Sequence, residues 1–102
     1  MSTRLEQLRK LAAAEPHDPM AHYAVALELV QLDRVAEAVD AFDAALRADP
    51  RYSAAYYHKG KALLKLGRND EARATLTEGI AVAQTAGDLK TVKEMTELRS
   101  ML

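Results

Sequence analysis

The sequence has no cysteine, no tryptophan and only five aromatic residues, four tyrosines and one phenylalanine, among its 102 positions. Without cysteine the chain can form neither a disulfide nor a thiolate zinc site, and it has no cysteine nucleophile. So few aromatic residues leave little bulk for a two-sheet sandwich. No apolar run approaches the roughly 18–20 residues of a membrane-spanning helix, and the first residues lack the apolar core of a secretory signal. We therefore expect a cytoplasmic protein.

The sequence also has no large excess of either charge, because it contains 14 basic and 15 acidic side chains and has a net charge of −1. This balance favours neither a nucleic-acid partner nor an anionic membrane. The charges are unevenly placed, since residues 1–50 carry 5 basic and 9 acidic groups and residues 51–102 carry 9 and 6. Alanine, a strong helix former, is abundant along the whole chain. Length and composition are typical of one helical domain without metal or disulfide support.

Turn and capping signals predict six helices and no strand. The expected helices cover about residues 3–14, 19–32, 34–48, 53–66, 69–85 and 88–102. Their expected N-terminal caps include Thr3, in a capping box with Glu6, and also Asp18, Asp33 and Asn69. Gly67 is expected to end the fourth helix with a positive φ angle. No expected linker is longer than about five residues, so we expect a single domain.

Apolar residues at helical spacing predict which side of each helix is buried. The expected buried core consists of Ala38, Phe42, Ala45, Gly60, Leu63, Ala72, Leu76 and Gly79. The first helix is expected to pack through Leu5, Leu8, Leu11 and Ala12, and the second through Val25, Leu29 and Leu32. The last helix carries a narrow apolar edge, expected at Leu89, Val92, Met95 or Thr96, Leu98 and Leu102. One apolar edge with polar flanks is typical of a helix that closes an array.

The middle of the chain repeats with a 34-residue period. At this offset small residues match small ones and large residues match large ones. The matched pairs are Ala26 with Gly60, Leu29 with Leu63, Ala38 with Ala72, Phe42 with Leu76, Ala45 with Gly79 and Leu46 with Ile80. One period earlier, Leu8 matches Phe42 and Pro16 matches Pro50. The first helix is therefore interpreted as the second half of an incomplete repeat.

This period and spacing resemble the tetratricopeptide repeat (TPR) family. Residues 19–52 match its pattern with His22, Val25, Ala26, Leu29, Ala38, Phe42, Ala45 and Pro50. Residues 53–86 match it with Tyr56, Lys59, Gly60, Leu63, Ala72, Leu76, Gly79 and Gln84. The resemblance implies an all-α, right-handed superhelical stack: a half repeat at 3–16, repeats at 19–52 and 53–86, and a capping helix at 88–102.

Three positions depart from the family pattern. His22 stands where the family has an aromatic or large apolar residue, and Lys59 stands where it has an aliphatic one. For Lys59 two interpretations stay open: its stem packs while the ammonium reaches water, or the second repeat is locally loose. Gln84 replaces the proline that ends a repeat, which agrees with a fifth helix about one turn longer than the third.

No group of residues predicts catalysis, a metal site or a cofactor. His17, His22 and His58 are spread over a turn and two repeats, and no cysteine supports them. Ser2, Ser53 and Ser100 lie at helix ends or at the terminus, where capping explains them. Gly60 and Gly79 occupy the small-residue places of the repeats, and Gly67 and Gly87 lie at helix ends, so none forms a phosphate loop. An enzyme is the least favoured function.

The resemblance implies a concave groove lined by the first helices of the two repeats. Its expected binding residues are Met20, Tyr23, Leu27, Val30, Tyr57, His58, Lys61 and Lys65. This face grades from apolar to aromatic and basic. It favours a non-catalytic interaction module for a peptide or a partner protein, with acidic groups toward the lysines and binding that strengthens below about pH 6.5 as His58 protonates.

Two further interpretations are weaker. A homodimer through the apolar groove or the terminal helices is an open alternative, although a monomer is favoured. One TPR subclass clamps the C-terminal carboxylates of heat-shock chaperones with a lysine and two asparagines. Here those places hold Tyr23, Leu27 and His58, so this partner is disfavoured.

Overall fold

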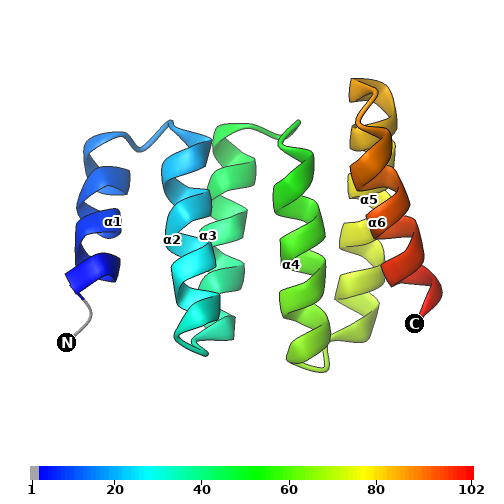
Figure 1. The fold of residues 1–102 in the computed structure, drawn as a ribbon, viewed down its shortest axis with the longest axis horizontal. Coiled ribbons are helices and arrows are strands. Elements are labelled where there is room, and N and C mark those ends of the chain that lie inside the picture. The colour runs from blue at the N-terminus through cyan, green and yellow to red at the C-terminus, as the bar shows by residue number, and fades with distance from the viewer. Residues whose placement is uncertain (1–2) are drawn as a thin grey trace.

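The structure, a computed structural model, describes residues 3–102 apart from the side chain of Thr3. Within this range the chain is all-α, with six helices and no strand (Figure 1). The helices are α1 (Thr3–Ala14), α2 (Pro19–Gln31), α3 (Val35–Ala48), α4 (Ser53–Lys65), α5 (Asn69–Ala86) and α6 (Leu89–Ser100). The capping box predicted at Thr3 depends on a side chain outside the described residues, and Ser2 lies outside them as well.

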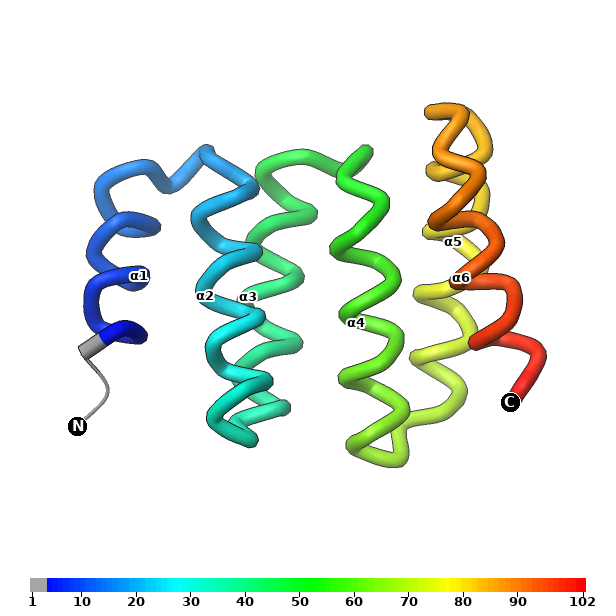
Figure 2. The backbone as a smooth tube through the Cα atoms, viewed as in Figure 1, coloured from blue at the N-terminus to red at the C-terminus, as the bar shows by residue number. Residues whose placement is uncertain are grey.

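The helices pack as sequential pairs along the long axis of the molecule, so that each helix contacts the next one in the chain. Figures 1 and 2 show α2 in front of α3 and α6 in front of α5, with α1 at the opposite end of the row from α6. The molecule measures 38 × 28 × 18 Å. Helices α2 and α4 therefore stand at the same place in successive pairs, as the 34-residue period predicts.

The turn inside each helix pair is built twice in the same way. In the first pair the Arg34 N–H donates to the Leu29 carbonyl (2.8 Å) and the Asp33 N–H to the Val30 carbonyl (3.0 Å). One period later, in the second pair, Arg68 and Gly67 make the same two bonds at 2.9 Å each. The residue at the centre has a positive φ, 59° at Asp33 and 74° at Gly67. Each turn is thus a Schellman motif.

The prediction that Asp33 and Asn69 cap helices is wrong. Because Asp33 takes the left-handed position that ends α2, it cannot also cap α3. Arg34 and Arg68 occupy the N-cap positions instead, and neither makes a side-chain capping bond. Their guanidinium groups pair with the carboxylate three residues later, Arg34 Nε with Glu37 Oε2 at 2.6 Å and Arg68 with Glu71.

Other capping predictions are confirmed. The Asp18 carboxylate accepts from the Met20 N–H (2.9 Å) beside Pro19 at the first helical position. Gly87 ends α5 with φ 73°, and the Asp88 carboxylate then caps α6 by accepting from the Thr91 N–H (3.2 Å). Asp88 also accepts from the Ser53 hydroxyl (2.8 Å), which ties the start of α6 to the start of α4. The pKa of the Asp88 carboxyl is lowered most by a hydrogen bond from the Thr91 side chain, and the bonds from Ser53 and from the Thr91 N–H lower it further.

All eight residues of the expected core are buried, but the predicted edges of three helices need correction. Leu11 is 58% exposed and Leu89 is 72% exposed, and Leu32, which lies in a turn, is 39% exposed. In α6 the predicted edge holds at Met95, which is buried, and at Val92, Leu98 and Leu102, which pack against the core, so Leu89 is the exception; Thr91 is buried in addition.

Small residues let α4 and α5 approach each other closely. A Cβ atom placed on Gly79 would lie 2.4 Å from the Tyr56 Cβ and 2.7 Å from the Met95 sulfur. A Cβ placed on Gly60 would lie 2.6 Å from a terminal methyl of Leu76. The two glycines therefore receive one large side chain each from the opposite helix, at the places where the repeat pattern predicts small residues.

The fourth residue of each repeat fixes the turn before it. The Tyr56 hydroxyl donates to the Pro50 carbonyl at 2.8 Å. In the preceding repeat the His22 Nε2 donates to the Pro16 carbonyl, also at 2.8 Å. His22 therefore replaces the aromatic residue of the family pattern with a group that makes the equivalent hydrogen bond.

Two ion pairs join acidic residues of the first helix pair to basic residues of the second. Lys59 Nζ lies 2.7 Å from Asp43 Oδ1, and Lys65 Nζ lies 3.2 Å from Asp33 Oδ1. Asp43 and Asp33 thus each meet one lysine of α4. For Lys59 the structure selects the first interpretation, because its stem is partly buried and its ammonium reaches a carboxylate.

We predict that Gly79→Ala destabilises the fold by about 1–3 kcal/mol, although alanine is the better helix former. The new methyl group meets the Cβ of Tyr56, which cannot move without its backbone. Gly60→Ala should cost less, because the new methyl group meets only the branched end of the Leu76 side chain, which can shift without its backbone. Urea unfolding measures the difference, with the exposed neighbour Glu78→Ala as control; a Gly79→Ala protein as stable as wild type would disprove this packing.

Met95 tests whether α6 is part of the core. Its side chain is fully buried among Tyr56, Leu76 and Ile80, whereas Met101, just after the end of the same helix, is 78% exposed. We predict that Met95→Ala lowers the free energy of unfolding by about 2–5 kcal/mol and that Met101→Ala changes it by less than about 0.5 kcal/mol. Equal effects of the two substitutions would show that α6 does not cover α4 and α5.

Candidate functional site

A hollow of about 260 Å³ lies between α2 and α4. Its walls are mostly apolar and its rim carries two lysines and a histidine. The lining residues are Leu27, Val30, Val35, His58, Lys61, Ala62 and Lys65. The structure therefore brings five of the eight predicted binding residues around one depression, since the 34-residue period places α2 and α4 in equivalent positions.

Two further predicted residues join this hollow through ring contacts with His58. The Tyr23 ring lies 5.7 Å from the His58 ring and the Tyr57 ring lies 5.2 Å from it, both edge to face. Phe42 stacks below His58 with centroids 6.2 Å apart. His58 thus sits at the centre of an aromatic cluster that joins α2, α3 and α4, and its position is fixed from several sides.

The two lysines at the rim differ in their partners. Lys65 Nζ is paired with Asp33, as described above. Lys61 forms no ion pair with any residue in the described part of the chain, and its ammonium lies 5.3 Å from the centre of the Tyr57 ring. A cation–π contact leaves most of the charge available to an incoming anion. Lys61 is therefore the uncompensated positive charge of this face.

Burial and charge shift the pKa of His58. Desolvation lowers the pKa of its imidazole below the ordinary value of 6.5, and the positive charge of Lys61 lowers it further. Glu94 on α6 acts in the opposite direction with a smaller effect. The imidazole is consequently neutral at pH 7, and its protonation falls below the pH of about 6.5 expected for an unperturbed histidine.

The same environment acts on a neighbouring tyrosine. Burial raises the pKa of the Tyr23 hydroxyl, with a further contribution from Tyr52, whose ring centre lies 5.0 Å away. Tyr23 therefore offers a neutral hydroxyl and a half-buried ring to this face. Met20, the remaining predicted residue, is 66% exposed and does not line the hollow.

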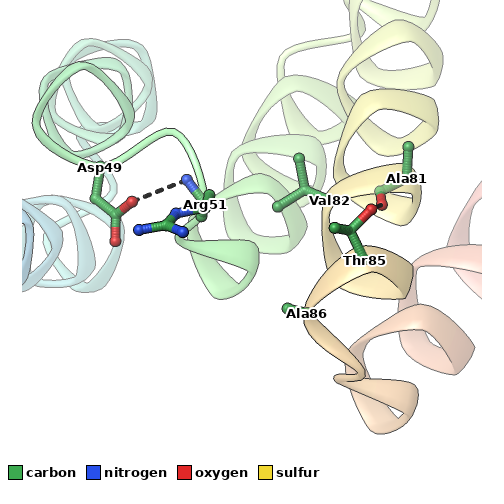
Figure 3. A pocket seen from close by; sticks show the side chains of 6 residues that line it. All are labelled: Asp49, Arg51, Ala81, Val82, Thr85 and Ala86. Atoms are coloured by element: carbon green, nitrogen blue, oxygen red, sulfur yellow. Dashed lines mark hydrogen bonds between the residues drawn. The ribbon is translucent and has the colours of Figure 1, made fainter.

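Sequence reasoning missed a larger hollow of about 560 Å³ near the start of α4 (Figure 3). It opens between the turn that carries Asp49 and Arg51 and the end of α5 at Val82, Thr85 and Ala86. The Asp49 carboxylate is occupied there, because it accepts from the Arg51 N–H (2.9 Å). The sequence signal for this hollow is the missing proline at position 84, which lets α5 continue past the turn.

The histidines are not arranged as a metal site. His22 is engaged with the Pro16 carbonyl and His58 lies among aromatic rings. Within residues 3–102 no three His, Asp or Glu side chains converge in a way that could hold a metal ion. In the same range none of the helices combines the length and the hydropathy needed to cross a bilayer.

Comparison with known proteins agrees with the repeat pattern. Two models of the tetratricopeptide repeat family match the chain, one over residues 29–95 and the other over residues 5–50. A search among curated proteins finds no significant match.

Solved structures give the same result. A tetratricopeptide repeat domain protein of Salinibacter ruber is 35% identical, with a TM-score of 0.77 over 84% of this chain and 87% of that one. A Bordetella parapertussis protein is 28% identical, with a TM-score of 0.83 over 99% and 88% of the two chains. The TPR2B domain of yeast Sti1, solved as a complex with pHsp70, shares the fold at 20% identity, with a TM-score of 0.89 over 94% and 77%. The 34-residue period, the paired helices and these matches show that the chain belongs to the tetratricopeptide repeat family.

Proposed function

We propose that the chain is a non-catalytic interaction module that binds a peptide segment or a partner protein on the face between α2 and α4. TPR domains act in general in protein–protein interaction. The observation that carries the proposal is the hollow with apolar walls and a basic rim, in which Lys61 lacks a carboxylate partner among the described residues. An apolar depression with a few polar groups at its edge is the usual form of a recognition site.

The chemistry of this face favours a ligand with acidic and apolar side chains close together. A carboxylate near Lys61 would compensate its charge and lie beside the Tyr57 ring. An aliphatic side chain would fill the space between Leu27 and Val30 on α2. Lys65 contributes less, because Asp33 already neutralises it.

The chaperone complex among the structural neighbours does not transfer to this chain. Yeast Sti1 TPR2B was solved with pHsp70, but its 20% identity supports the fold alone. At the places of the carboxylate-clamping residues this chain has Tyr23, Leu27 and His58. We therefore infer a different ligand, one that presents an acidic side chain beside an aliphatic one.

A random 12-residue peptide library displayed on phage provides the ligand for the test. We predict that selected peptides are enriched in Asp or Glu next to Leu, Ile or Val. Lys61→Glu should slow their association and remove its salt dependence, because an exposed charge mainly steers encounter. Tyr57→Ala should weaken binding by about 1–2 kcal/mol through faster dissociation, because it removes buried area.

The matched control is Lys10→Glu, which makes the same charge change at an exposed position on α1. Surface plasmon resonance at two salt concentrations gives both rate constants, and NMR shift mapping gives the location. Wild-type binding by both groove variants, or shifts confined to helices other than α2 and α4, would place the site elsewhere.

The lowered pKa of His58 predicts how binding depends on pH. The affinity for an acidic peptide should be constant from pH 8 to about 6.5 and increase only below that, because the half-buried imidazole protonates at a lower pH than an ordinary histidine. The stability of the free protein changes in the opposite direction, because the fold disfavours the charged imidazolium. The stabilising effect of the neutral imidazole is complete above about pH 6.5 and decreases as the pH falls through the folded pKa.

An NMR titration of the imidazole, assigned with His58→Gln, measures both effects. The free protein should titrate below 6.5, and a bound acidic peptide should raise the pKa. A peptide that leaves the titration unchanged binds away from His58.

A further inference from the structure

One stripe of α1 is only partly covered although it carries two leucines, since Leu8 packs against the core at its edge and Leu11 does not. Residues Arg4, Leu8, Leu11 and Glu15 follow each other at spacings of four, three and four, so they lie on one side of the helix. Leu11 is 58% exposed and Leu8 is half-buried. Glu15 continues the stripe past the end of α1, since its N–H still donates to the Leu11 carbonyl at 2.9 Å.

The same stripe is covered in every full repeat. One period after Arg4, Leu8 and Leu11 stand Ala38, Phe42 and Ala45 in α3, and one further period on stand Ala72, Leu76 and Gly79 in α5. All six of these residues are buried, beneath the first helix of the same pair. Among the described residues no helix lies at that place beside α1.

We propose that this stripe docks a second copy of the chain, with the two α1 helices antiparallel about a twofold axis. The charge order supports this occupant. Arg4 lies near one end of the stripe and Glu15 at the other, so an antiparallel pair places Arg4 of one copy opposite Glu15 of its partner. The same alignment places Leu8 opposite Leu11, and both apolar residues leave water.

The side chains of the stripe also disfavour a helix of the ordinary repeat kind. In α3 and α5 the close contact depends on alanine or glycine at the first and third positions of the stripe. In α1 these positions hold Arg4 and Leu11, which keep a neighbouring helix further away. A helix that brings leucines and opposite charges of its own fits this wider spacing.

The proposed interface is small, so we expect the dimer to be weak. Helix α1 has 12 residues, about 18 Å of helix, so the buried area falls below that of a standard stable dimer. We therefore expect a dissociation constant between about 10 μM and 1 mM, with the chain monomeric at low micromolar concentration.

Sedimentation velocity on the full chain from about 5 μM to 1 mM tests the dimer. We expect Leu11→Glu to raise the dissociation constant at least tenfold. Met20→Glu makes the same kind of change at an equally exposed apolar residue on α2 and should alter it by less than twofold. A monomer throughout this range, or a dimer that depends on Met20 instead of Leu11, would overturn the proposal.

A charge exchange tests the antiparallel alignment. Arg4→Glu and Glu15→Arg should each weaken the dimer, and the double variant should restore it. Arg4 also contacts Glu28 within its own chain (3.1 Å), but that loss is common to the Arg4 single variant and the double variant. A double variant as weak as the single ones would refute the alignment.

The absence of cysteine from the sequence allows an independent test by cross-linking. A mixture of the Leu8→Cys chain and the Leu11→Cys chain should form a disulfide-linked dimer faster than either chain alone. Equal rates in the mixture and in the separate samples would exclude Leu8 and Leu11 as opposite residues.

Discussion

The fold depends on the close approach of the two helices of each repeat. In the second repeat this approach exists because Gly79 leaves room for Tyr56 and Gly60 leaves room for Leu76. Each large side chain fills the space that the opposite glycine leaves, so the helix pair has no freedom to slide. Because protein interiors are closely packed, adding one methyl group at such a contact displaces the neighbouring side chains. The 34-residue period of small and large residues is therefore a period of helix contacts.

This constraint also builds the candidate site. Because both pairs are closed by the same turn and held by the same hydrogen bond from residue 22 or 56 to a proline carbonyl, α2 and α4 stand in equivalent orientations. Their equivalent sides then form one face. The residues on it are not equivalent: α2 supplies Leu27 and Val30 and α4 supplies His58 and Lys61. The backbone repeats, but the surface it presents changes from apolar side chains on α2 to basic side chains on α4.

Electrostatics divides the lysines of α4 into two groups. Lys59 and Lys65 are matched by Asp43 and Asp33 of the preceding pair, so two basic groups of the second half of the sequence meet acidic groups of the first. Among the three, Lys61 has an aromatic ring in place of a carboxylate. By residue type the three lysines are equivalent candidates for ligand binding. Their partners distinguish them, because two are in ion pairs and one is not. The ion pairs at the surface add little stability, and their larger effect is to leave Lys61 as the charge a ligand meets.

The sequence by itself determined the six helices, their order and the buried positions at Ala38, Phe42, Ala72 and Gly79, because a repeated pattern of side-chain size specifies helix contacts locally. The resemblance to the tetratricopeptide repeat family implied in addition that α2 and α4 share one face. Only the tertiary structure decided the exposure of Leu11 and Leu89, the partner of each lysine, the low pKa of His58 and the hollow beside Val82. These features depend on distances between helices that are far apart in the chain. Periodicity assigns a residue to one side of its own helix, and the neighbouring helices decide what lies on that side.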